Sequence, residues 1–321
     1  LATIVGLSVT IGYGVSQFAS GLFNITQFDW LVGENSQPTI GAQLLGLLLI
    51  IGASCLSAMS GLHKGIKWLS NVNMILSLVL ILFFMLFGAS VFAFKTFFIT
   101  IYDYLLALPE MSFTVWNSND SEIIGKLQSW QSSWTIFYWA WWIAFAPFVG
   151  IFLARVSKGR TIREYVFGAI IVPSLICLVW FAFIGGTAID LELSGEAQGS
   201  IINTDISNQL FATVNLITSE GFAATLSVII VILLLTFLIT SADSGILIIN
   251  TLASGGSSDR REVKHIIVWG VIFASLIGTL LFAGGMDALR SVMIIGALPF
   301  SIVMVLMGIS FLKTCLEDKD Y

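Results

Sequence analysis

Aromatic residues gather in one apolar stretch of this sequence, at a spacing suited to holding a cation. Trp134, Tyr138, Trp141, Trp142 and Phe145 follow one another at intervals of four, three, one and three residues, which places most of them on one side of a helix. The faces of aromatic rings attract positive charge, and Trp attracts it most strongly. A quaternary ammonium group has no hydrogen to donate, so a dry site can hold it with such faces. The pattern predicts an aromatic cation-binding surface.

Two other interpretations of these aromatic residues stay open at this point. Trp and Tyr also collect where a helix leaves the hydrocarbon core of a membrane, a position that suits Trp130 and Trp134. It suits Trp142 less, because twelve residues of helix beyond Trp130 reach about 18 Å, near the middle of a core about 30 Å thick. Tight packing between helices is the second alternative.

A second group of polar residues interrupts an apolar stretch further along the chain. Thr240 and Ser241 stand together there, and Asp243 follows them. Hydroxyl oxygens and unwound backbone carbonyls bind sodium in some transporters, although Ser and Thr also bond back to the preceding helical turn. An acidic residue inside a membrane span is functional by default. Asp243 stands so far along its apolar stretch that a structural role in helix packing or gating is an equal alternative.

The composition requires a membrane to position these residues. Of the 321 residues, 57% are hydrophobic and 10% are charged, and the mean hydropathy is +0.96, whereas soluble domains carry about 25% charged residues. The net charge of −5 comes without a basic run that could bind nucleic acid. Three separated cysteines and two histidines (Cys55, Cys177, Cys315, His63 and His265) predict neither a disulfide framework nor a zinc site.

Eight segments are long and apolar enough to cross a bilayer as helices, which takes about 20 residues each. They are also too long and continuous for outer-membrane strands. The sequence therefore predicts an all-α integral membrane protein, with spans at residues 1–24, 40–61, 72–94, 131–154, 165–188, 222–250, 266–285 and 292–312.

Basic residues orient these spans. If residue 1 is cytoplasmic, eleven of the fourteen Lys and Arg residues face inward, which is the positive-inside pattern. The opposite orientation inverts the pattern. The inward residues are Lys64, Lys67, Arg155, Lys158, Arg160, Arg163, Arg260, Arg261, Lys264, Lys313 and Lys319, and the outward ones are Lys95, Lys126 and Arg290.

Two outer loops are long. The loop at 95–128 contains apolar residues at helical spacing between 97 and 108, which predicts an amphipathic helix lying on the outer surface. The loop at 189–221 is acidic and polar, with a short amphipathic stretch from Leu210 to Leu216.

Several motifs resemble those of one transporter family. The stretch Trp134-Thr-Ile-Phe-Tyr-Trp-Ala-Trp-Trp-Ile-Ala-Phe-Ala-Pro-Phe-Val-Gly150 and the following basic loop, residues 154–163, resemble the signature helix and loop of the betaine/carnitine/choline transporters. Residues 61–73, 185–188 and 239–244 resemble three further stretches of that family. The resemblance runs essentially from end to end, and its Trp-rich part is the most specific.

The resemblance implies an architecture. Members of the family have twelve spans, ten of which form a LeuT-type inverted repeat, and this chain resembles spans five to twelve. It begins at Leu1, inside an apolar stretch. We therefore expect the N-terminal four spans, with their half of the substrate site, to be missing from this chain.

The resemblance also implies substrate-binding residues. Trp142 matches the main one and Trp141 a second candidate, with Phe145 and Tyr138 beside them. The family commonly has Trp-Trp-x-Ser-Trp-Ser-Pro where this chain has Trp141-Trp142-Ile143-Ala144-Phe145-Ala146-Pro147. The changes weaken one aromatic face and remove two hydroxyls, which favours slightly a substrate without a carboxylate, such as choline. Pro147 is expected to kink or break the helix.

Ion-binding residues follow from the same resemblance. The backbone carbonyl of Phe237 and the hydroxyls of Thr240 and Ser241 match a second sodium site. Thr3 matches one threonine of a first sodium site, beside which Phe148 is retained. Leu7 stands where sodium-coupled members have another threonine, so this first site is expected to be impaired. Sodium, protons or neither could drive transport. No other cofactor is expected.

The implied function is import of a quaternary ammonium compound of the choline, glycine betaine or carnitine type, by alternating access, across the inner (plasma) membrane. A LeuT-type carrier of another small solute is the alternative. A membrane enzyme is disfavoured, because the sequence lacks a zinc motif, a Gly-x-Ser-x-Gly elbow and paired intramembrane carboxylates. A channel is disfavoured because no charged ring or filter motif is present. Residues 97–108 resemble the helix through which family members form trimers, so a homotrimer is expected.

Overall fold

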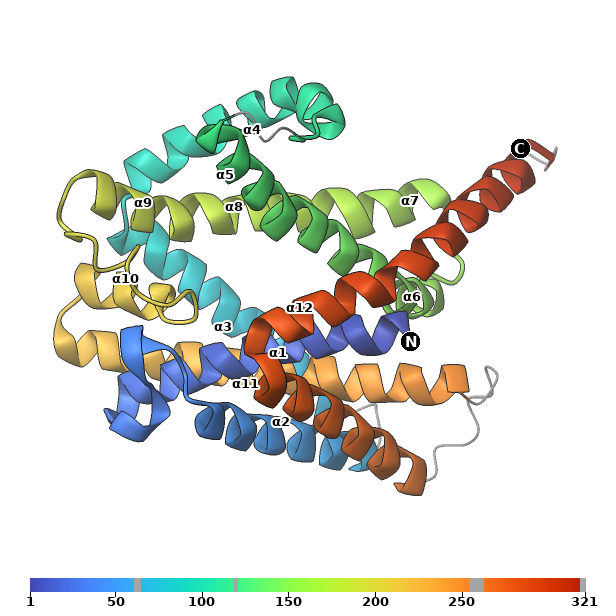
Figure 1. Cartoon of the computed structure of the whole chain (residues 1–321), viewed down its shortest axis with the longest axis horizontal. Coiled ribbons are helices and arrows are strands. Elements are labelled where there is room, and N and C mark those ends of the chain that lie inside the picture. Colours follow the sequence, from blue (N-terminus) through green and yellow to red (C-terminus); the bar gives the residue numbers. More distant parts are fainter. Residues whose placement is uncertain (61–64, 118–120, 254–262, 318–321) are drawn as a thin grey trace. The chain divides into compact units, whose positions relative to one another are not determined.

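The computed structural model describes residues 1–60, 65–117, 121–253 and 263–317. Over these ranges the chain is helical, apart from turns, connecting segments and one isolated antiparallel bridge between Val32 and Pro38. Lys64, Arg260, Arg261 and Lys319, which contributed to the predicted orientation, lie outside the described residues. The longer helices (Figure 1) are α1 (Ala2–Thr26), α2 (Ile40–Ser60), α3 (Gly65–Phe87), α4 (Ser90–Phe113), α5 (Glu122–Trp130), α6 (Phe137–Val156), α7 (Ile162–Val166), α8 (Val172–Trp180), α9 (Gly186–Leu193), α10 (Gln209–Ile217), α11 (Glu220–Ala253) and α12 (Val263–Glu317).

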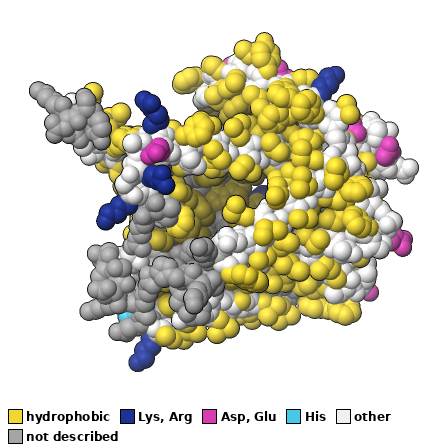
Figure 2. Space-filling model, turned by 180° about the vertical axis from the view of Figure 1, so that it is seen from behind, with side chains coloured by type: hydrophobic (Ala, Val, Ile, Leu, Met, Phe, Trp, Pro, Cys, Tyr) yellow, Lys and Arg dark blue, Asp and Glu magenta, His cyan; other side chains and the backbone are white. Residues whose placement is uncertain are grey.

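Eight helical segments of the described chain are long and apolar enough to cross a membrane. Their outward side chains are largely apolar, and Figure 2 shows such side chains covering most of one face. Lipid-facing helices must satisfy their backbone polar groups internally and can expose apolar side chains freely. The prediction of an all-α membrane protein is confirmed.

The spans divide differently from the predicted boundaries. The segment 72–94 is split, because α3 ends at Phe87 and α4 begins at Ser90. A Cβ on Gly88, between them, would lie near the Phe84 carbonyl and the Thr187 hydroxyl, so this turn requires a residue without a side chain. The stretch 97–108, predicted as a surface helix, forms part of α4, which is itself one of the eight span-length helices.

The segments 266–285 and 292–312 both lie within α12. Gly284 (φ −165°, ψ 20°) and Gly285 (φ 60°, ψ −143°) interrupt the helical backbone between them. Glycine adopts the positive φ of Gly285 at little cost, because it has no Cβ. The helix resumes at once, so Arg290, predicted in an outer loop, is a helical residue.

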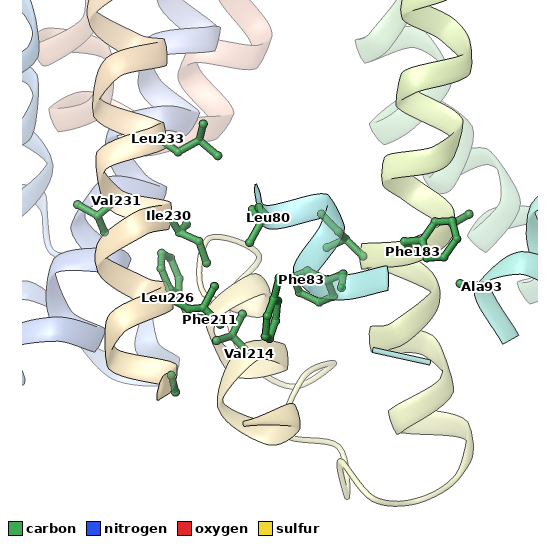
Figure 3. Close-up of a cluster of buried hydrophobic side chains, with 14 of the residues drawn as sticks. Leu80, Phe83, Ala93, Phe183, Phe211, Val214, Leu226, Ile230, Val231 and Leu233 are labelled. Carbon is green, nitrogen blue, oxygen red and sulfur yellow. The ribbon is translucent and has the colours of Figure 1, made fainter. Parts of the chain in front are cut away.

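The chain divides into two compact units. The second unit consists of residues 13–114 and 155–244. Its core (Figure 3) joins α3, α10, α11 and the π-helical turn η5 (Phe181–Gly185) through large buried side chains. Phe84 and Phe211 are fully buried there. Burial of each such ring stabilises the unit by about 1.5–3 kcal/mol.

Small residues bring α1 close to α11 in this second unit. A Cβ on Gly14 would meet the side chain of Leu238, and one on Gly21 would meet Val231. The two helices accordingly lie side by side over this stretch (Figure 1). Close approach at small residues is how helices pack where lipid competes equally for apolar surface.

A single carboxylate organises the segment after α9. Glu192 Oε1 accepts hydrogen bonds from the backbone N–H groups of Ile201 (3.0 Å) and Ile202 (2.8 Å). Its Oε2 accepts from the N–H of Gly199 at 3.0 Å. A carboxylate that accepts three backbone donors holds a segment without regular structure in one conformation.

Replacing Glu192 by glutamine will therefore loosen this segment. An amide replaces two charged acceptor oxygens by one neutral acceptor and a donor, and hydrogen bonds to charged groups contribute about 1.5–3 kcal/mol each. Hydrogen exchange at Gly199, Ile201 and Ile202 is the measurement, with Glu196→Gln, at an exposed position of the same segment, as the control. Equal exchange in the two variants would contradict the assignment.

The first unit consists of residues 1–12, 115–154 and 245–321. In it, the beginning of α1 makes close contacts with α6, the end of α11 and α12. Glycine lies on one side of each contact, which allows close approach of the backbones. The four pairs are Gly6 with Ala144, Leu7 with Gly245, Val5 with Gly296 and Gly12 with Leu289.

Candidate substrate and ion sites

Three aromatic residues form a ladder along the helix that carries the Trp-rich motif. The rings of Trp134 and Tyr138 are stacked, with centroids 6.0 Å apart and an interplanar angle of 10°. Tyr138 continues to Trp141 at 5.8 Å and 36°. Tyr138 and Trp141 were predicted as site residues, and the structure brings them together.

Phe137 packs against two members of this ladder, and the sequence did not identify it as a site residue. Its ring lies 5.3 Å from Tyr138 and 5.4 Å from Trp141, and only 3% of the residue is exposed. The guanidinium of Arg290, from α12, lies 5.3 Å from the Phe137 ring centroid, within the range of a cation–π interaction. The four-residue interval between Phe137 and Trp141 was the available signal, since it places both on one helix face.

A hydrogen bond to α1 fixes the indole of Trp141. Its Nε1–H donates to Thr10 Oγ1 at 3.1 Å, and the Thr10 hydroxyl donates to the carbonyl of Gly6 at 3.2 Å. The same part of α1 touches α6 at Gly6, where a Cβ would lie 3.1 Å from that of Ala144. Close packing and a hydrogen bond together set the orientation of the Trp141 ring.

The other two predicted substrate residues lie apart from the ladder. Trp142 is 68% exposed, so its ring is free to meet a ligand or another part of the protein. Phe145 packs edge-on against Phe148, with ring centroids 5.2 Å apart. The structure thus groups Tyr138 with Trp141 and Phe145 with Phe148, and leaves Trp142 exposed.

The helix continues through Pro147, so of the expected kink or break the break is absent. A proline lacks the N–H that would bond to the carbonyl of Ile143, and its ring crowds that carbonyl. The irregular part of this segment lies earlier instead, in the π-helical turn η3 (Gln131–Ile136), directly before α6. Such turns are frequent at functional sites.

The predicted ion ligands are divided between the two units. In the second unit, α11 is unbroken at Phe237 and Thr240, and the Thr240 hydroxyl donates to the carbonyls of Thr236 and Phe237, both at 3.0 Å. The hydroxyl thus bonds to the preceding helical turn, as Ser and Thr often do in helices. Its hydrogen is used there, and the lone pairs of its oxygen are left to bind a cation. Ser241 is half-buried on the same helix.

Two predicted ligands lie in the first unit. Thr3 is buried in α1, and Phe148 packs on Phe145 in α6. Leu7, which the resemblance places where sodium-coupled members have a threonine, is fully buried against Gly245. The side chain of Ser8 donates to the carbonyl of Ile4 at 2.8 Å.

Comparison with known proteins connects this arrangement to a family. The profile of the betaine/carnitine/choline transporter (BCCT) family matches residues 1–320. This chain belongs to that family. The match confirms the resemblance drawn from the Trp-rich motif, and with the eight apolar helices it makes the chain a multi-pass protein of the plasma membrane.

Three relatives illustrate the range of this betaine/carnitine/choline family. The glycine betaine transporter OpuD of Bacillus subtilis is 38% identical over 99% of this chain and 58% of its own length. The glycine betaine/proline/choline transporter VP1723 of Vibrio parahaemolyticus is 34% identical over 99% and 54%. The ectoine/hydroxyectoine transporter of Virgibacillus pantothenticus is 37% identical over 98% and 59%. The chain spans about half the length of the curated relatives it matches.

Removing the hydroxyl of Thr10 will destabilise this family member. Thr10→Val keeps the volume but leaves the half-buried indole N–H of Trp141 without its acceptor, at a cost of about 1–2 kcal/mol. Thermal unfolding of the purified protein in detergent measures the effect. Thr10→Ser is the control, because it keeps the hydroxyl and is expected to restore most of the loss. A Thr10→Val variant as stable as the unmodified protein would contradict a structural role for the hydroxyl.

Proposed function

We propose that the protein is a secondary active transporter that imports a quaternary ammonium compound of the choline, glycine betaine or carnitine type. The observation that carries the proposal is the ladder of Trp134, Tyr138 and Trp141 in the family's signature helix. The names of the relatives from Bacillus and Vibrio support the same substrate class.

The chemistry of this helix suits a cation without hydrogen-bond donors. The sequence of α6 contains no acidic residue, so a carboxylate of this helix cannot neutralise the charge of the substrate. Aromatic faces attract a quaternary ammonium group. Unlike a carboxylate, they are not strongly hydrated, so they lose little when water leaves the site. Trp142, exposed on the same helix, supplies a further face, and Phe145 a weaker one.

The architecture we propose is a LeuT-type inverted repeat that works by alternating access. Sodium drives uptake through the carbonyl of Phe237 and the hydroxyls of Thr240 and Ser241. Thr3 and Phe148 are what remains of a first ion site in which Leu7 replaces a hydroxyl. A proton is the alternative coupling ion.

We also propose a homotrimer in which residues 97–108 of α4 form the contact between copies. Large apolar side chains of this stretch are exposed in the single chain, including Phe98, Tyr102 and Leu105. Replacing Phe98 and Leu105 by serine should convert the trimer to a monomer in native mass spectrometry. A trimer that persists would place the contact elsewhere.

Binding of two matched ligands tests the substrate class. Choline and its neutral carbon analogue, with tert-butyl in place of trimethylammonium, have the same shape and differ in charge. Because two or more rings attract the positive charge, we expect choline to bind at least about tenfold more tightly than the neutral analogue. Equal affinities measured by calorimetry would show that shape alone is recognised and would sink the proposal.

A carrier of another small solute is the second candidate. The relative from Virgibacillus is named for ectoine and hydroxyectoine, and the signature helix has Ala144, Phe145 and Ala146 where the family commonly has Ser, Trp and Ser. Competition between ectoine and labelled choline separates the two candidates. Full displacement by ectoine at lower concentration than by unlabelled choline would favour the second.

A further inference from the structure

Three helices of the first unit meet beside the aromatic ladder. On α12, Leu289 is buried, and a Cβ on Gly12 of α1 would meet its side chain. The next residue of α12, Arg290, places its guanidinium carbon 5.3 Å from the ring centroid of Phe137 on α6. These contacts with α1 and α6 hold this part of α12 in place.

Arg290 brings a positive charge to helices that otherwise lack charge here. Residues 2–12 of α1 and 137–154 of α6 contain no Asp, Glu, Lys, Arg or His. On α12 itself, Arg290 Nη1 lies 3.4 Å from Asp287 Oδ1, but the side chain of Asp287 is 89% exposed, and so exposed an ion pair contributes little. A guanidinium has five donors, so it can bind a second carboxylate beside this one.

The aromatic rings of the ladder lie within reach of this guanidinium. The ring centroid of Phe137 is 5.3 Å from that of Tyr138 and 5.4 Å from that of Trp141. Because the guanidinium carbon of Arg290 is 5.3 Å from the same Phe137 centroid, it lies at most about 11 Å from the other two. Tyr138 is 44% exposed and the side chain of Arg290 is 30% exposed, so a ligand can contact both.

A small zwitterion can span this separation. Its ammonium nitrogen can lie up to about 6 Å from a ring centroid, and the carboxylate carbon of glycine betaine follows about 2.5 Å further on. A carboxylate that accepts two hydrogen bonds from a guanidinium lies about 4 Å from the guanidinium carbon. Together these lengths reach about 12 Å, so one molecule can meet a ring and the guanidinium at once.

We propose that Arg290 is a specificity-determining residue, which binds the carboxylate of a zwitterionic substrate while Tyr138 or Trp141 holds its trimethylammonium group. The inference rests on the proposed function and selects, within that substrate class, the ligands that carry a carboxylate. In such a ligand the carboxylate lies nearest to the guanidinium and the ammonium group nearest to the rings. Attraction to Arg290 therefore exceeds repulsion.

The guanidinium supplies donors that the signature helix lacks. This helix has Ala144 and Ala146 where the family commonly has two serines, so two hydroxyls that could donate to a carboxylate are missing from α6. A planar guanidinium donates two parallel hydrogen bonds to a carboxylate and carries the opposite charge. The loss of the hydroxyls therefore does not exclude a carboxylate from the substrate.

Two ligands of nearly the same shape test the role of Arg290. Glycine betaine and its amide, in which a carboxamide replaces the carboxylate, carry the same trimethylammonium group, and calorimetry with the purified protein measures the affinity of each. We expect glycine betaine to bind at least about tenfold more tightly than the amide, because hydrogen bonds between charged groups are the stronger ones. In Arg290→Gln the affinity for glycine betaine should fall at least about tenfold, and that for the amide by less than about threefold.

Two further variants separate binding from a structural role. Asp287→Asn removes the neighbouring charge on α12 and should not weaken binding of glycine betaine. Arg290→Lys keeps the positive charge but not the planar fork, so it should retain part of the preference for glycine betaine over the amide. An equal loss of both ligands in Arg290→Gln, or a loss of glycine betaine binding in Asp287→Asn as large as in Arg290→Gln, would overturn the inference.

The comparison of the two ligands in the unmodified protein decides the question even if Arg290→Gln fails to fold. Equal affinities for glycine betaine and its amide would overturn the role of Arg290 and leave the proposed function intact, since both ligands are quaternary ammonium compounds. Failure of glycine betaine, its amide and choline to bind would instead contradict the proposed function, and the inference with it.

Discussion

Replacing Trp142 by leucine will lower uptake of a quaternary ammonium substrate by about tenfold to a hundredfold. Each aromatic face in a dry site contributes about 1–2 kcal/mol to cation binding, and contact area with the large ring is lost as well. Because Trp142 is 68% exposed, the substitution removes little packing within the chain. Initial rates of uptake of labelled choline and glycine betaine into proteoliposomes measure the effect.

Trp139 provides a matched control for this variant. It lies on the same helix and is 67% exposed, but it stands outside the positions that resemble the family's substrate residues. Trp139→Leu should therefore retain most of the uptake. Substrate binding that survives in Trp142→Leu, or an equal loss in both variants, would remove Trp142 from the substrate site.

Replacing Gly6 by valine will prevent α1 from packing on α6. A Cβ at this position would lie 3.1 Å from the Cβ of Ala144, 3.2 Å from its carbonyl carbon and 3.3 Å from its carbonyl oxygen. Backbone atoms cannot move aside as a flexible side chain can, and the two methyl groups of valine add to the overlap. The expected destabilisation is about 3 kcal/mol, with loss of the hydrogen bond that positions Trp141. Thermal unfolding in detergent and the yield of folded protein measure it.

Gly150 is the control position on α6 itself, since a Cβ there would meet nothing within 4 Å. Gly150→Val also replaces a helical glycine by valine, but without a clash. Its change in melting temperature therefore reports only the different helix propensities of glycine and valine. Similar melting temperatures for the two variants would contradict the close contact at Gly6.

Much of the fold could be predicted from the sequence because each element depends on local composition. Apolar runs of about 20 residues specify helices in lipid wherever they occur. The helix ends differ from the predicted spans where a glycine decides them: Gly88 separates α3 from α4 inside an apolar run, and Gly285 turns the chain without a polar loop. Hydropathy is insensitive to both, because glycine is neither strongly apolar nor polar.

The candidate site was predictable only in its local part. Tyr138 and Trp141 are neighbours through helical spacing, which the sequence shows directly. The bond from Trp141 to Thr10 joins residues 131 positions apart, and the position of Arg290 over Phe137 depends on how α12 packs. No periodicity in one segment contains such information. The exposure of Trp142 likewise reflects which helices surround it.

The measurement that tests the central claim most directly is uptake of labelled choline and glycine betaine into proteoliposomes under an imposed sodium gradient, a proton gradient, or neither. We expect uptake driven by sodium, and its reduction in a variant with Thr240 and Ser241 replaced by alanine. Uptake driven by protons instead would keep the transport function and reduce those hydroxyls to a structural role. No uptake of either solute under any gradient would contradict the claim that this protein imports quaternary ammonium compounds.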